Sequence, residues 1–250
     1  MKDRHATAIA HLSKADKKLG KLITQCPPCG IKPNYLQNVF EALMESIVYQ
    51  QLSGKAAATI LNRVKALYFP PDTPTHDTRH GKALPFPTPE QLLSTPDELL
   101  RSAGLSGNKT KAVKDLAAKT IDGTVPDVKA IRKMSDDDII SHLTQVRGIG
   151  RWTVEMILLF NLYRPDVWPV DDLGVRKGYM KLQGLAEMPK PKELMALGEV
   201  YKPYRSVAAW YMWRAIEQIK DKPKAAAPAV KKVVKKKAAK KKRVAAKAAR

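Results

Sequence analysis

Apolar residues recur at spacings of three and four along most of the chain, a pattern that predicts amphipathic helices. Clear examples are Ile9, Leu12, Leu19, Leu22 and Ile23, then Phe40, Leu43, Met44 and Ile47, then Ile60, Leu61, Val64 and Leu67. No strand-like alternation extends beyond a few residues. The fold class is therefore predicted to be all-α.

Turn and capping residues divide this helical pattern. Residues 69–90 are rich in Pro and Thr and are predicted to form a long exposed loop. Thr88 and Thr95 each precede a proline, with Gln or Glu three positions on, so both predict helix starts. Ser135 precedes three aspartates (136–138), whose charge suits the first turn of a helix better than a metal site.

Charge is distributed unevenly along the 250 residues. Residues 221–250 contain 11 Lys, 2 Arg and 1 Asp, hence +12 of the total +21, and residues 1–220 carry the remaining +9. The final segment has no aromatic residue, which predicts a Lys/Ala-rich disordered tail after a folded unit over 1–220. Excess positive charge in both parts favours nucleic acid as the partner. No run approaches the roughly 20 apolar residues of a membrane span, and the N-terminus has an amphipathic pattern in place of a signal-peptide apolar core, so an intracellular protein is expected. It is further expected to be a monomer that acts on DNA.

Cys26 and Cys29 are the two cysteines of the chain. Their C-x-x-C spacing occurs in redox pairs and in half-sites for zinc, but a structural role at a turn is favoured. Two cysteines are too few for a four-cysteine iron–sulfur cluster. No metal and no cofactor is expected.

A glycine hairpin is the first candidate for function. Gly148 and Gly150 flank Ile149 between two apolar helical stretches, so the backbone there can turn tightly and approach a phosphate closely. Thr153, near the start of the second helix, can add a hydroxyl to the same anion. An isolated G-x-G is also compatible with an ordinary turn between helices.

An acidic residue follows this hairpin at an informative spacing. Pro169 restricts the backbone just before Asp171, and Asp172 is the adjacent rival. With its G-x-G hairpin followed by P-x-D, the chain resembles the helix-hairpin-helix (HhH-GPD) superfamily of DNA glycosylases. The P-x-D frame implies that Asp171 is the catalytic carboxylate and that Asp172 caps the next helix.

Within that superfamily the chain is most similar to the 3-methyladenine DNA glycosylase II branch, from about residue 5 to 220. The matching segments are Glu45 to Ala57, Gly104-Leu105-Ser106 with Lys109, the hairpin, and Tyr204-Arg205-Ser206 with Trp213. The resemblance implies a two-lobed helical fold. One lobe comprises about 1–35 plus 175–220, and the other comprises 36–174 with the hairpin at 139–163.

The resemblance also implies roles for several side chains in holding the base. Trp152 and Trp213 match the walls of the base pocket, although Trp213 shares a helix face with Trp210 and is also compatible with the core. Met156 stands where some relatives have a tyrosine, which leaves the hold on the base less aromatic. Bifunctional relatives have a lysine at the position of Trp152, and an indole cannot form a Schiff base.

A second set of residues is predicted to contact DNA. Leu52 matches the wedge that fills the gap left by an extruded nucleotide, although on pattern alone it would be a core residue. Gln51 is placed to touch base edges and Lys55 a phosphate. Ser53 lies in the same segment and can cap the following helix.

These features together predict a monofunctional DNA glycosylase that flips alkylated purines out of double-stranded DNA and hydrolyses the N-glycosidic bond, initiating base excision repair. Two alternatives remain open. One is a glycosylase for mismatched or oxidised bases, and the other is a non-catalytic helix-hairpin-helix protein that only binds DNA.

Overall fold

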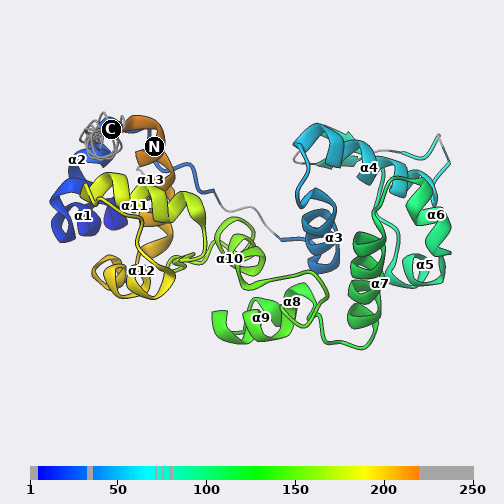
Figure 1. The fold of residues 1–250 in the computed structure, drawn as a ribbon. Helices are drawn as coiled ribbons and strands as arrows, with labels where there is room; N and C mark the ends of the chain where they lie inside the picture. The colour runs from blue at the N-terminus through cyan, green and yellow to red at the C-terminus, as the bar shows by residue number, and fades with distance from the viewer. Residues whose placement is uncertain (1–4, 33–35, 71, 75, 79–80, 220–250) are drawn as a thin grey trace, which may run out of the picture. The chain divides into compact units, whose positions relative to one another are not determined.

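A computed structural model describes residues 5–219, except 33–35, 71, 75 and 79–80 (Figure 1). Internal contacts group Met1–Ile219 into one unit. The predicted disordered tail at 221–250 lies outside the described residues. Over the described residues the predicted all-α fold is confirmed, with one small exception in the loop before α5.

Helices from the two ends of the chain pack together on one side of Figure 1. They are α1 (Ala6–Ala15), α2 (Lys17–Gln25), α11 (Leu173–Gln183), α12 (Pro191–Leu197), the 3₁₀ helix η1 (Glu199–Tyr201) and α13 (Arg205–Gln218). Helix α13 contacts α1, α2 and α11, so it forms the centre of this group. The predicted boundaries of the two lobes stay a prediction.

A second group of helices is built around α7. It contains α3 (Val39–Tyr49), α4 (Gly54–Ala66), α5 (Pro89–Ser94), α6 (Asp97–Ser102) and α7 (Gly107–Ile121). Figure 1 shows α8 (Val128–Ile131), α9 (Asp136–Leu143) and α10 (Arg151–Phe160) between the two groups. The chain crosses between the groups through the α9–α10 hairpin, which places that hairpin beside elements of both.

Side chains cap many of these helices, as the sequence predicts. Thr88 and Gln91 form a reciprocal capping box at the start of α5, and Ser135 accepts from the Asp138 N–H at the start of α9. The cap predicted at Thr95 is wrong. The Thr95 hydroxyl instead donates to the Gln91 carbonyl and bonds the Tyr68 hydroxyl at 2.6 Å, while α6 begins after Pro96 without a side-chain cap.

The segment predicted as a long loop contains a short antiparallel hairpin, β1 (His76–Thr78) paired with β2 (Gly81–Ala83). Lys65 anchors the return of this segment to α4. Its ammonium donates to the Leu84 carbonyl at 3.0 Å and lies 3.6 Å from the centre of the Phe86 ring. Burial lowers the pKa of the Lys65 ammonium, and a carbonyl and an aromatic face partly replace its lost water.

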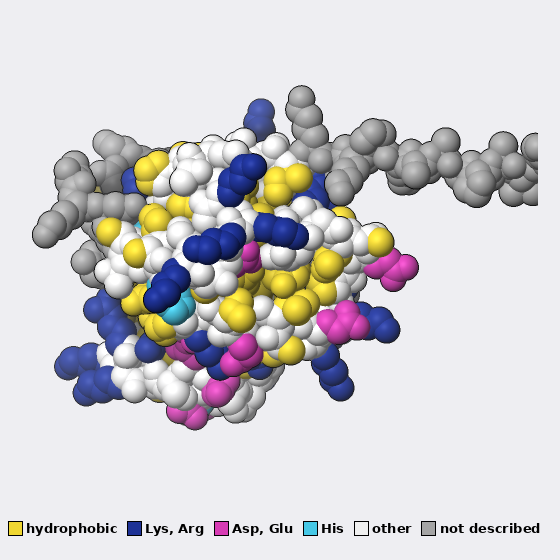
Figure 2. Space-filling model, turned by 90° about the vertical axis from the view of Figure 1, so that its left-hand side faces the viewer, with side chains coloured by type: hydrophobic (Ala, Val, Ile, Leu, Met, Phe, Trp, Pro, Cys, Tyr) yellow, Lys and Arg dark blue, Asp and Glu magenta, His cyan; other side chains and the backbone are white. Residues whose placement is uncertain are grey.

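The side of the molecule formed by the first group carries side chains of mixed character. Figure 2 shows hydrophobic side chains near the middle of this face, with basic and acidic side chains around them. A surface of mixed charge is poorly suited to binding a polyanion such as DNA. Among the described residues, no helix combines the length and apolar character required to cross a bilayer.

Candidate functional site

The α9–α10 hairpin has the backbone geometry that its glycines predict. Gly148 has a φ of +79°, a value that side chains rarely tolerate, and Gly150 is the N-cap of α10 without a side-chain cap. Ile149 is buried with 4% exposure and anchors the turn in the core. Both glycines are exposed, so the first amides of α10 form a site suited to a phosphate.

A second exposed turn lies beside this hairpin. It is the tip formed by residues 50–53, between α3 and α4, and the Gln50 side-chain amide donates to the Gly148 carbonyl at 2.9 Å. Gln51, Leu52 and Lys55 are exposed, and 39% of Leu52 is accessible, which is incompatible with a core role. Ser53 caps α4 by accepting from the Ala56 N–H.

Of the adjacent residues Asp171 and Asp172, Asp172 makes the more specific contacts. As the N-cap of α11 it accepts the Val175 N–H at 2.7 Å on Oδ1. The same oxygen accepts the Trp213 indole N–H at 2.8 Å, and Oδ2 accepts the Trp152 indole N–H at 2.8 Å. Since a carboxylate has about four lone-pair directions, Oδ2 retains acceptor capacity for a further partner.

Asp171 is arranged differently. Its side chain is exposed, whereas Asp172 is partly buried between the two indoles. The expectation that Asp172 caps α11 is confirmed. The two indole N–H groups that its carboxylate accepts also favour Asp172 over Asp171 as the functional carboxylate. Trp152 and Trp213, which are 61 positions apart, are brought together by Asp172.

A cavity of about 480 Å³ opens between the tip and the hairpin helix. Its lining comprises Ser46, Tyr49, Gln50, Gln51, Trp152, Thr153 and Met156. Trp152 and Met156 therefore share a wall, as their predicted role requires. Thr153 is buried and belongs to the same wall, which favours a pocket role over the predicted contact with a phosphate.

Two residues that support this site were not predicted from the sequence. The ring of Phe160 stacks on Trp213, with 5.8 Å between ring centroids and 26° between planes. A Cβ on Gly174 would lie 2.6 Å from Cδ1 of Trp213 and 3.0 Å from Oδ1 of Asp172, so a glycine is required there. The signal in the sequence is that Gly174 lies only two residues after Asp172.

Glu155 is a buried carboxyl on the same helix. Its side chain is 3% exposed, Oε1 accepts from Nε of Arg151 at 3.0 Å, and Oε2 has no hydrogen-bond partner among the described residues. Burial raises the pKa of Glu155 to about 7, against the opposing effect of Arg151 and with added repulsion from Asp171 and Asp172. Near neutral pH this carboxyl is therefore partly protonated.

Removing the Glu155 charge is expected to change how stability depends on pH. Because the folded pKa is about 7 and the ordinary value is 4.5, the favourable contribution is complete below pH 4.5 and is lost as pH rises to about 7. Relative to Glu155→Gln, the wild type should lose about 2–3 kcal/mol of unfolding free energy over this range. Urea unfolding of both proteins from pH 4.5 to 8 measures the difference, and parallel curves would contradict the assignment.

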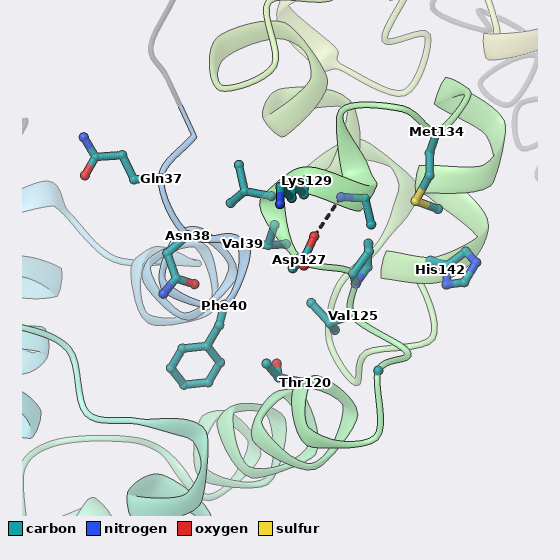
Figure 3. A pocket seen from close by; sticks show the side chains of 14 residues that line it. Gln37, Asn38, Val39, Phe40, Thr120, Val125, Asp127, Lys129, Met134 and His142 are labelled. Carbon is teal, nitrogen blue, oxygen red and sulfur yellow. Dashed lines mark hydrogen bonds between the residues drawn. The ribbon is translucent and has the colours of Figure 1, made fainter.

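A larger cavity, of about 980 Å³, lies at the other end of α3 (Figure 3). Asn38 and Phe40 line it from the start of α3, and Asp127 and His142 from the α8 and α9 region. It shares no lining residue with the cavity that contains Trp152. Trp152 thus lines a separate, smaller cavity, and its indole N–H connects that cavity wall to Asp172.

Comparison with known proteins gives a consistent match. The family model described as "HhH-GPD superfamily base excision DNA repair protein" matches residues 44–203. DNA-3-methyladenine glycosylase 1 from Schizosaccharomyces pombe is 37% identical over 207 residues, covering 82% of this chain and 84% of the relative.

Solved structures agree with the sequence match. The 3-methyladenine DNA glycosylase of Schizosaccharomyces pombe, determined in complex with abasic DNA, aligns with a TM-score of 0.69 and 34% identity, covering 86% of this chain and 100% of the other. A DNA-3-methyladenine glycosidase from Bacillus halodurans has the same TM-score, 0.69, at 32% identity and covers 84% of this chain and 89% of its own.

Proposed function

Because this chain belongs to the HhH-GPD superfamily of base excision DNA repair proteins, we propose that it is a monofunctional glycosylase that excises alkylated purines from duplex DNA. The observation that carries the proposal is the Asp172 carboxylate, bound by the Trp152 and Trp213 indoles. Its substrate is double-stranded DNA containing an alkylated base, on which the protein acts as a monomer inside the cell. The names of the relatives support this substrate class.

The chemistry requires one carboxylate and no strong acid. Alkylation at a ring nitrogen makes the purine cationic, so the base departs as a neutral molecule with the electrons of the N-glycosidic bond. The negative charge of Asp172 stabilises the positive deoxyribose, and its free lone pair on Oδ2 orients water toward C1′. The water oxygen bonds to C1′ and its proton passes to Asp172 and then to solvent, which leaves an abasic site.

Recognition of the base follows from the walls of the site. Trp152 is 45% exposed and lines the cavity together with Met156. An indole face attracts a cation by about 1–2 kcal/mol when water is excluded, and it stacks on a planar purine as well. A cationic purine is therefore favoured over an undamaged neutral one, even though Met156 adds no aromatic ring.

Trp152 also bears on the type of reaction. Its indole nitrogen donates to Asp172, so the hairpin side chain that reaches the reactive carboxylate is not a nucleophile. Without an amine at this position, no Schiff base forms with the sugar. Strand cleavage is therefore not part of the proposed activity.

Incubation with methylated duplex DNA tests the proposed function. Alkylated purines should appear as free bases, and strand breaks should appear after alkali treatment and not before. Matched duplexes containing a mismatch or an oxidised guanine serve as controls. Release from those duplexes alone would favour the first alternative, binding without any release would favour the non-catalytic alternative, and breaks without alkali would contradict the monofunctional assignment.

A further inference from the structure

Helix α7 holds the tip at residues 50–53 through one lysine. The Lys109 ammonium donates at 2.7 Å to the Val48 carbonyl and at 2.7 Å to the Gln50 carbonyl, both at the C-terminal end of α3. The last carbonyls of a helix have no partner within it and carry its negative dipole end. Lys109 therefore supplies hydrogen bonds to carbonyl groups at the end of α3 that have no partner within that helix.

The tip needs such support because its backbone is strained. Gln51 has a φ of +57°, in the left-handed region that glycine usually occupies at the end of a helix. A non-glycine residue persists there when its surroundings fix it. The Lys109 ammonium fixes the backbone carbonyl of Gln50, the residue just before Gln51. The side-chain amide of Gln50 donates to the Gly148 carbonyl and so attaches the tip to the hairpin.

Helix α7 also contacts the α9–α10 hairpin, farther along the helix. Asp115 accepts the Arg147 N–H at 2.7 Å, and Lys119 donates to the Gln145 carbonyl at 2.6 Å. Lys109 and Asp115 are six residues apart, a rise of about 9 Å along a helix. Helix α7 thus fixes the position of the exposed Leu52 relative to the hairpin turn at Gly148 and Gly150.

We propose that Lys109 is a positioning residue for base extrusion, which holds the strained tip so that Leu52 enters the DNA stack while the hairpin binds the backbone. This inference rests on the proposed function and on the wedge role of Leu52 that the resemblance implies. Extrusion costs a few kcal/mol of stacking and pairing, so a loose tip loses the interaction that offsets this cost.

Lys109→Met tests the proposal, since methionine keeps much of the side-chain volume and removes the donors. The matched control is Lys111→Met, two positions along the same helix and exposed. A duplex with 2-aminopurine beside a non-cleavable abasic analogue reports unstacking by fluorescence without any base release. At saturating protein, Lys109→Met should lose most of the fluorescence increase, and Lys111→Met should retain it.

Base release gives the second measurement. Single-turnover release from methylated duplex should fall by about 10- to 100-fold for Lys109→Met, with a change below about 3-fold on the same single strand. Equal losses on both substrates, or an unchanged fluorescence increase, would overturn the proposal. If the wild type releases no base, the proposed function fails while the fluorescence still decides the role of Lys109.

A double-mutant cycle separates positioning from a general loss of folding. Gln51→Gly removes the penalty of the positive φ, so the Lys109→Met effect on fluorescence should be smaller in that background. An effect of equal size in both backgrounds would contradict the role in holding Gln51. Thermal unfolding accompanies each variant, and Lys109→Gln, which keeps a shorter donor, repeats the comparison if methionine lowers the folded fraction.

Discussion

Asp172→Asn is expected to reduce the release of alkylated bases by about 10³-fold or more while leaving DNA affinity nearly unchanged. Asparagine keeps a side-chain oxygen that can cap α11 through the Val175 N–H, so the fold is retained. It removes the negative charge that the developing deoxyribose cation requires. Single-turnover release from methylated duplex, together with fluorescence anisotropy for binding, measures both quantities.

Asp171→Asn is the control for this result. The Asp171 carboxylate is exposed and lies next to Asp172 in the chain. Asp171→Asn therefore removes a nearby negative charge and leaves the contacts of Asp172 with the two indoles in place. We expect its release rate to stay within about 3-fold of the wild type, because an exposed charge is screened by solvent. A large loss in Asp171→Asn with a small one in Asp172→Asn would return the catalytic role to the residue that the P-x-D frame selects.

The two aspartates show where the sequence reaches its limit. The spacing after the hairpin located the acidic pair, and capping rules assigned the start of α11 to Asp172, which the structure confirms. The P-x-D frame assigns the catalytic role to Asp171, and that assignment stays a prediction. A capping carboxylate, however, satisfies one N–H with one oxygen, and its other oxygen remains available outside the helix.

Local patterns predicted what depends on local chemistry. The period of apolar residues gave the helices, and Gly148 and Gly150 gave the hairpin, because backbone conformation is decided within a few residues. Contacts across the chain were harder to predict. Glu155 accepts from Arg151 through one carboxylate oxygen. Its second oxygen has no partner among the described residues, because remote segments bury it.

The site also depends on close packing of α11 against α13, which carry Asp172 and Trp213 at their adjoining parts. Gly178, inside α11, is the contact point. A Cβ there would lie 1.9 Å from the Met212 carbonyl oxygen and 2.5 Å from its carbonyl carbon, both of them backbone atoms of α13. The absence of a side chain at Gly178 therefore sets the distance between the two helices, and Met212 is the residue next to Trp213.

Gly178→Ala is expected to lower the free energy of unfolding by at least about 3 kcal/mol. Alanine favours an isolated helix over glycine by about 1 kcal/mol, but a rotamer change cannot relieve overlap with a backbone carbonyl, so the two helices must separate. For a unit of this size the loss corresponds to a fall in Tm of about 6–12 °C. Urea unfolding and calorimetry measure the two quantities.

Gly107→Ala provides the matched control, because a Cβ at Gly107 has nothing within 4 Å. Gly107 begins α7, so alanine there should change stability by less than about 1 kcal/mol, in the favourable direction. Separation of α11 and α13 should also move the Trp213 indole away from Asp172, so Gly178→Ala should lose base release even at temperatures where it stays folded. A stable Gly178→Ala protein with normal release would show that this helix contact does not position the carboxylate.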